Sequence, residues 1–183
     1  PTEGSPGKKM KIGLIAGGGQ FPLLFTQRAI QKGYDVVAVG FTSETDKDLA
    51  DQVSQFKWLY LGQVTKLVNF FKRHGISQAV MLGTISKTNI FKDIRPDLKA
   101  LAFIARTGRT HDDSILSSFA NLLSKEGIQI KPSTFLLPEL ISVKGCWTKR
   151  KPDKAEKKDI YQGWKLAKEI GKLDIGQCIV ISN

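Results

Sequence analysis

The chain has 183 residues, of which 41% are hydrophobic and 25% charged, the composition of a globular protein that can bury a substantial core. Its net charge of +11 favours an acidic partner, such as nucleic acid, an anionic membrane surface or a phosphorylated substrate. Two cysteines and two histidines are too few for a disulfide framework or a zinc site, and no apolar segment approaches the roughly 20 residues that span a bilayer. We therefore expect a cytoplasmic protein.

Residues 1–9 precede Met10, are rich in Pro, Gly and Ser, and are expected to be disordered or a cloning remnant. From there to residue 131, short apolar runs predict strands at about 11–16, 35–40, 56–61, 77–82 and 127–130. Several of these runs are apolar on both faces, as in a parallel sheet covered by helices on each side. Residues 10–131 are thus predicted to be a Rossmann-like α/β domain.

The intervening segments have apolar residues at helical spacing, and the basic residues and glycine that follow three of the predicted helices are typical of helix ends. Three apolar faces are predicted: Phe21, Leu24, Phe25 and Ala29; Val64, Leu67, Val68 and Phe71; and Leu98, Leu101, Ala102 and Ala105. A further helix after residue 111 is expected to turn Ile115, Phe119, Leu122 and Leu123 inward.

The pattern changes at residues 132–158, which are rich in proline and basic residues and are predicted to be a linker and surface stretch. Residues 159–183 then predict an amphipathic helix, with Ile160 and Trp164 on one face, and a strand in "QCIVIS". One helix and one strand bury little by themselves. We interpret them as the beginning of a second, incomplete α+β domain whose remainder is absent. A second copy of the chain, in a homodimer, could complete it.

Three consecutive glycines stand at the carboxyl end of the first predicted strand, where open α/β sheets bind ligands. They match a dinucleotide fingerprint poorly, because Pro22 replaces the third glycine and "GFTSE" after the second strand offers no clear ribose-binding acid. A P-loop pattern is also missing. The three glycines could form a tight turn with no ligand. The favoured interpretation is that they let a ligand approach the backbone. The predicted substrate-binding residues here are Gly17, Gly18, Gly19, Gln20 and Phe21.

The fourth predicted strand opens into a polar segment that would face the same crevice. Its candidate substrate-binding residues are Gly83, Thr84, Ser86 and Lys87, with a polar turn and a solvated Lys87 as the alternative.

Asp112 and Asp113 could hold Mg²⁺ or the sugar of a substrate. Thr110 and Asp113 also fit a helix-capping signature, which is the favoured interpretation. Arg106 and Arg109 beside them could grip a phosphate or be solvated.

The basic run from Lys144 to Lys158 lacks interleaved aromatic stacking residues, and no nucleic-acid-binding motif is present. We therefore expect no nucleic-acid partner. A basic surface near anionic lipid fits this run at least as well.

Five segments in order resemble one family, the UDP-2,3-diacylglucosamine pyrophosphatases of the LpxI type. They are "GLIAGGGQFPLL", "VMLGTISK", "DDSILSSFANLLSKEGIQI", "TFLLPELISVKGCWT" and "DIYQGWKLAKEIGKLDIGQCIVI". The resemblance runs from about Met10 to the last residue. Lys87 and Thr88 depart from it, because they stand where the family commonly has Arg-Pro.

The resemblance implies a cytoplasmic enzyme of lipid A biosynthesis in Gram-negative bacteria, peripheral to the inner membrane. It would use Mg²⁺ to hydrolyse the pyrophosphate of UDP-2,3-diacylglucosamine to UMP and 2,3-diacylglucosamine 1-phosphate. It also implies a glycolipid bound between two domains, and a catalytic aspartate in an E-G-T-D motif beyond Asn183. This chain is accordingly expected to be an inactive fragment, and a non-catalytic nucleotide- or glycolipid-binding module is the alternative.

Overall fold

The computed structural model describes residues 9–86, 94–107, 112–173, 175–176 and 178–181. Its contacts divide the chain into two compact units, Pro1–Ile141 and Ser142–Asn183, and each is described by itself.

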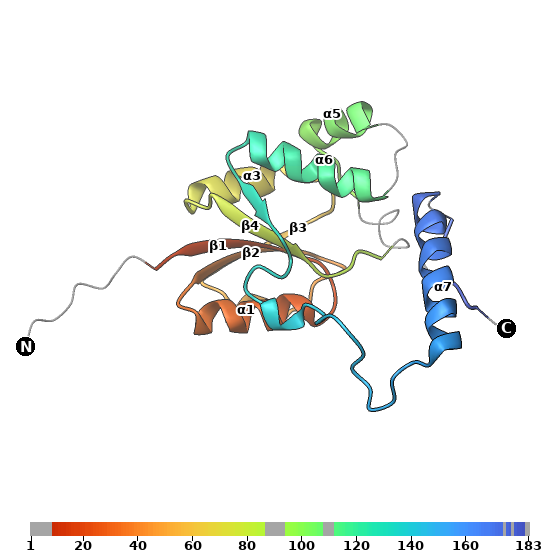
Figure 1. Cartoon of the computed structure of the whole chain (residues 1–183). Coiled ribbons are helices and arrows are strands. Elements are labelled where there is room, and N and C mark those ends of the chain that lie inside the picture. Colours follow the sequence, from red (N-terminus) through yellow and green to blue (C-terminus); the bar gives the residue numbers. More distant parts are fainter. Residues whose placement is uncertain (1–8, 87–93, 108–111, 174, 177, 182–183) are drawn as a thin grey trace, which may run out of the picture. The chain divides into compact units, whose positions relative to one another are not determined.

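A five-stranded parallel sheet forms the centre of the first unit (Figure 1). Its order is β3-β2-β1-β4-β5, so β1 lies in the middle and pairs with β2 from Lys11↔Asp35 to Ala16↔Gly40. The strands are β1 (Lys11–Ala16), β2 (Asp35–Phe41), β3 (Gln55–Leu59), β4 (Gln78–Leu82) and β5 (Gln129–Lys131). All five predicted strands are present, and the Rossmann-like α/β class is confirmed.

Helices cover both faces of this sheet, with α1 on one side and α3, α5 and α6 on the other (Figure 1). They are α1 (Phe21–Gln31), the short α2 (Leu49–Gln52), α3 (Val64–Arg73), α5 (Leu98–Thr107) and α6 (Asp112–Lys125). Two apolar clusters result, one on each face of the sheet. The clusters bury strand residues of both orientations, which explains why the strand sequences are apolar on both faces.

Helix α3 buries the face that its sequence predicts: Val64, Leu67, Val68 and Phe71 are all buried. The prediction for α1 is wrong in part. Pro22, Phe25, Thr26 and Ala29 form its buried stripe, whereas Phe21 and Leu24 are exposed. Phe21 is the first residue of the helix.

The predicted inward face of α5 is also wrong. Leu98 is 83% exposed and Leu101 is 50% exposed, while Ala100, on another side of the helix, is buried. The anchoring of the preceding residue, Asp97, accounts for this rotation. Its carboxylate accepts hydrogen bonds from Thr65 N at 2.6 Å and from Ala100 N at 3.0 Å, which fixes where α5 begins and which residue turns inward.

Asp97 thereby caps two helices at once, since Thr65 lies in the first turn of α3 and Ala100 in the first turn of α5. Burial raises the pKa of Asp97, but hydrogen bonds from the backbone of Ala100 and Thr65 outweigh it, so the pKa lies below its usual value. The carboxylate form is therefore the one that stabilises the fold.

Residues 132–141 pack with the first unit, which differs from the linker predicted for 132–158. Leu136 and Leu137 are buried beside α1, and Lys32 Nζ donates a 2.9 Å hydrogen bond to Leu136 O. The 3-10 helix η1 (Pro138–Leu140) follows, and Glu139 forms an ion pair with Arg28 of α1 at 2.8 Å. Two leucines inside a proline-containing stretch have no helical or strand periodicity, so this packing cannot be predicted from the sequence pattern.

The second unit contains α7 (Lys154–Lys172), which begins with a capping box between Asp153 and Glu156. Ile181 packs against Gly163 of this helix, where an added Cβ would lie 3.1 Å from the isoleucine side chain. The strand predicted in "QCIVIS" does not form in the described residues 178–181, which have no ladder partner there.

Replacing Asp97 with Ala should lower the free energy of unfolding by about 2 kcal/mol, because two helices lose a cap at once. Urea denaturation measures this change. Asp51, an exposed acid in the first turn of α2, supplies the control, and Asp51→Ala should change stability by about 0.5 kcal/mol or less. Equal effects of the two substitutions would contradict the double cap.

Glu126 directly follows α6, and its carboxylate binds Lys72 of α3 at 2.6 Å and also Lys99 of α5. It thus links three helices. Hydrogen bonds from Lys72 and Lys99 lower the pKa of Glu126 from 4.5 to about 2. Since the pKa is lower in the folded state, the carboxylate stabilises the fold above about pH 4.5, and this contribution is lost as the pH falls toward about 2. The stability difference between the wild type and Glu126→Gln should therefore shrink over that window. A difference that stays constant in urea titrations from neutral pH downward would show that the ion pairs contribute nothing.

Candidate functional site

Three loops meet at the carboxyl edge of the sheet. They are residues 17–20 after β1, 42–48 after β2 and 83–86 after β4. Because β1 lies between β2 and β4, the strand order reverses here, and open α/β sheets bind their ligands at such a switch point. The predicted glycine loop and the loop after the fourth strand are thus neighbours.

The loops after β1 and β4 are joined through their main chains. Gly17 N donates a 2.8 Å hydrogen bond to Leu82 O, and Gly18 N donates one of 2.8 Å to Thr84 O. Thr84 N donates in return to Gly18 O at 3.0 Å, which makes an isolated antiparallel bridge between these two residues. The amides of Gly17 and Gly18 are therefore engaged within the protein.

Glycine is required at this junction because the two backbones approach so closely. A Cβ on Gly17 would lie 2.5 Å from Thr84 O, and a Cβ on Gly83 would lie 2.6 Å from Gly18 O. Gly83 also has a φ of 95°, a conformation that side chains disfavour. Gly17 and Gly83 thus serve the contact between loops.

The loop after β2 is tied to the same edge by Thr45 and Glu44, two residues that the sequence analysis did not single out. The buried Thr45 Oγ1 donates a 2.6 Å hydrogen bond to Ala16 O and accepts one of 2.8 Å from Phe41 N. The Glu44 carboxylate accepts a 3.1 Å hydrogen bond from Ser86 N. Glu44 could have been proposed from the sequence as a residue of this edge, because it is the acid of "GFTSE", which closely follows the second predicted strand.

The open part of the edge consists of Gly19, Gln20 and Phe21, which are all exposed. Gln20 precedes α1 without a side-chain cap, and the first turn of this helix has no acidic residue. Within the described ranges, no hydrogen bond engages the main-chain N–H groups of these three residues. Uncapped amides at the positive end of a helix are a favourable arrangement for an anion such as a phosphate.

Of the other predicted site residues, some lie at this edge and some lie outside the described part of the chain. Thr84 is exposed and Ser86 is half-buried at the same edge. Lys87 lies outside the described residues. Asp112 and Asp113 begin α6, and their side chains also lie outside the described part of the chain.

A magnesium site does not emerge from the residues that the structure describes. Among them, no group of three or more His, Cys, Asp or Glu side chains lies together as a metal site would require. Glu44, the carboxylate at the sheet edge, already accepts a hydrogen bond from Ser86 N.

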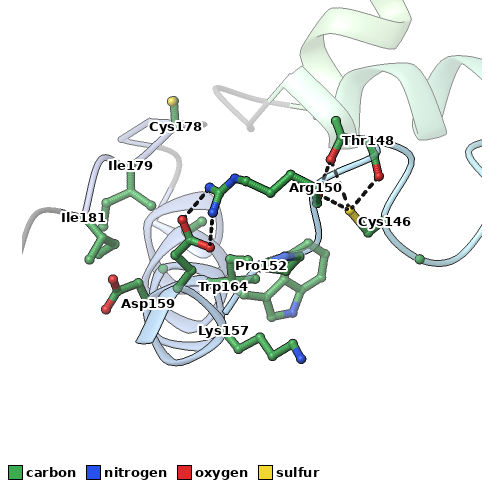
Figure 2. Close-up of a pocket in the computed structure, with 15 residues that line it drawn as sticks. Cys146, Thr148, Arg150, Pro152, Lys157, Asp159, Trp164, Cys178, Ile179 and Ile181 are labelled. Carbon is green, nitrogen blue, oxygen red and sulfur yellow. Dashed lines mark hydrogen bonds and ion pairs between the residues drawn. The ribbon is translucent and has the colours of Figure 1, made fainter. Parts of the chain in front are cut away.

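The second unit contains a hollow of its own, between α7 and residues 145–152 and 178–181 (Figure 2). Its wall is largely apolar, with Trp164, Ile179 and Ile181 among the lining residues. The Arg150 guanidinium forms a two-pronged contact with the Glu156 carboxylate, at 3.1 and 2.5 Å. The cation is thereby already neutralised within the protein.

Comparison with known proteins gives the family. A model of the LpxI N-terminal domain matches residues 11–140, and a model of the LpxI C-terminal domain matches residues 143–183. The chain belongs to the LpxI family. The LpxI domain boundary falls close to the division between the two compact units, at Ile141 and Ser142.

A curated relative of this LpxI chain comes from Caulobacter vibrioides and is named UDP-2,3-diacylglucosamine pyrophosphatase LpxI. The two are 28% identical over 174 residues, which cover 93% of this chain and 61% of the relative. The chain thus spans about three fifths of the length of that protein. No helix in the described ranges is long and apolar enough to cross a membrane.

Solved structures give weaker likenesses to this LpxI chain. A UDP-glucose-4-epimerase from Stenotrophomonas maltophila has a TM-score of 0.41 and 9% identity, covering 66% of this chain and 36% of the epimerase. An L-threonine dehydrogenase from Cupriavidus necator has a TM-score of 0.37 and 17% identity, covering 64% of this chain and 34% of the dehydrogenase. Likenesses at this level say nothing about ligands.

The close contact between the two loops of this LpxI chain predicts that Gly17→Ala destabilises the fold by about 2–3 kcal/mol, because a methyl group would collide with the backbone of Thr84. Gly33 has a φ of 80° and open space around it, so Gly33→Ala should cost about 1 kcal/mol from backbone strain alone. Urea denaturation compares the two. If Gly33→Ala proves the more harmful, the packing described for Gly17 is incorrect.

Proposed function

We propose that this chain supplies the nucleotide-binding part of a UDP-2,3-diacylglucosamine pyrophosphatase of lipid A biosynthesis. The observation that carries the proposal is the uncapped start of α1, with the exposed amides of Gly19, Gln20 and Phe21 at the switch point of the sheet. Membership of the LpxI family and the name of the Caulobacter relative support the choice of reaction.

In the proposed reaction, the oxygen of a water molecule forms a new bond to one phosphorus of the pyrophosphate. The anhydride P–O bond breaks, UMP and 2,3-diacylglucosamine 1-phosphate leave, and the protons of the water pass to the phosphates and solvent. The amides of Gly19, Gln20 and Phe21 would stabilise the negative charge on the diphosphate. Further substrate contacts proposed for this chain come from Gly83, Thr84, Ser86, Lys87, Asp112 and Asp113.

Mg²⁺ and a catalytic aspartate are also part of the proposal, and we assign neither to a described residue. The Caulobacter relative is longer than this chain, which covers 61% of its length. We propose that the catalytic carboxylate belongs to the region of the relative that has no counterpart here. We also propose that the protein contacts the inner membrane and forms a homodimer.

A nucleotide- or glycolipid-binding module without hydrolytic activity is the second candidate. The arrangement at the sheet edge favours it as much as it favours an enzyme, because anion-binding amides by themselves bind a nucleotide without cleaving it. The two candidates differ in one measurable quantity, the release of UMP.

The proposal predicts that this chain binds UMP and that Gln20→Pro weakens the binding roughly tenfold, because proline removes one N–H donor to a charged phosphate. Gln20 has a φ of −82°, which proline adopts readily, and thermal unfolding checks that the variant folds. Gln20→Ala keeps the N–H and should bind as the wild type does. Titration calorimetry with UMP measures all three proteins. Equal affinities of the proline and alanine variants would exclude this amide from the site.

Release of UMP from UDP-2,3-diacylglucosamine in the presence of Mg²⁺ should be detected with the Caulobacter relative and not with this chain alone. UMP release by this chain would contradict the assignment of the catalytic carboxylate to the region of the relative that has no counterpart here. A relative that binds UMP but releases none from the substrate would favour the non-catalytic module.

A further inference from the structure

The strand order indicates where the rest of a bound nucleotide would lie. With the phosphate at the end of β1, the ribose comes to the end of β2, where dinucleotide-binding folds place an acidic residue. Glu44 follows β2 closely and stands in that position. The base would then extend toward β3, two strand spacings or about 10 Å from β1.

An aromatic–cation stack lies at the end of β3. Tyr60 directly follows the last residue of that strand, and the Arg95 guanidinium lies over its ring, 3.8 Å from the ring centre. Arg95 is exposed and Tyr60 is half-buried. The guanidinium thus has one face on the ring and is accessible to solvent.

The backbone around this stack is held firmly. Arg95 N donates a 2.8 Å hydrogen bond to Leu61 O, and Asp97 N donates one of 3.1 Å to Gly62 O. Gly62 has a φ of 88°, and a Cβ added to it would lie 2.8 Å from Pro96 Cα. The segment carrying Arg95 is therefore fastened to the loop after β3, so the guanidinium is positioned before any ligand arrives.

Among the described residues, no ion pair involves Arg95, and the nearby Asp97 carboxylate is committed to Thr65 N and Ala100 N. An exposed planar cation with donors at its edge suits a pyrimidine base, which has carbonyl acceptors and a ring that stacks.

We propose that Arg95, held over the Tyr60 ring, binds the base of the nucleotide and makes the site prefer a nucleoside phosphate to a sugar phosphate. The inference rests on the proposed function, since it assumes that the phosphate lies at Gly19, Gln20 and Phe21. It assigns a separate role to residues outside that loop: the amides bind the phosphate, and the stack recognises the base.

The test compares UMP with ribose 5-phosphate, which keeps the phosphate and sugar but has no base. Arg95→Lys preserves the charge and removes the planar face, and Tyr60→Leu removes the ring beneath it. Each should weaken UMP binding about tenfold in calorimetry and leave ribose 5-phosphate binding unchanged. Tyr60→Phe keeps the ring and is the matched control. Thermal unfolding verifies that each variant folds.

The outcomes separate this inference from the proposed function. Gln20→Pro should weaken both ligands alike, because it affects the phosphate. Suppose that the wild type binds UMP, and that Arg95→Lys lowers the affinity for UMP and ribose 5-phosphate equally or changes neither affinity. The assignment of Arg95 to the base is then overturned, and the phosphate site stands. If the wild type binds neither ligand, the proposed function and this inference fall together.

Discussion

The main-chain pairing of Gly18 with Thr84 is the constraint on which the candidate site depends. It joins the ends of β1 and β4, which are neighbours in the sheet although far apart in the sequence. Side chains at Gly17 or Gly83 would force these loops apart. Because the pairing uses the amides of Gly17 and Gly18, it also decides which part of the glycine loop can meet a ligand, and leaves that role to Gly19 and the start of α1.

Much of the fold could be predicted from the sequence, because strands buried on both faces have a composition that few other structures require. The face of α3 was predictable for a similar reason: its apolar residues form a single stripe. In α5 apolar residues occur on more than one side, so periodicity alone cannot choose between faces. The choice comes from Asp97, through a hydrogen bond to Thr65 that spans 32 residues.

The location of the candidate site could be predicted from the sequence. Which of its residues face a ligand and which hold a neighbouring loop could not. Glycines after a first strand indicate close approach of a backbone, yet the sequence does not say whether a ligand or another loop approaches. In the structure Gly17 meets a loop and Gly19 faces open space. Thr45 and Glu44 escaped notice because their hydrogen bonds, to Ala16 and Ser86, exist only once the strands are aligned.

The carboxyl edge is tied together strand by strand. Gly18 with Thr84 links β1 to β4, Thr45 links β2 to β1, and Arg95 with Leu61 fastens residues 94–97 to the loop after β3. A surface fixed in this way loses little conformational entropy when a ligand binds, so a few contacts can give useful affinity. The same fixation limits where those contacts can be, because a main-chain amide that already donates to another loop cannot also donate to a ligand. Among the described residues, the start of α1 and the Tyr60–Arg95 stack are positioned at the two sides of this edge, and the half-buried Glu44, which accepts a hydrogen bond from Ser86 N, follows the strand between them. That spacing of anion site, acid and stacking surface follows the order of phosphate, ribose and base in a nucleotide, which is why we assign the two ends to different parts of one ligand.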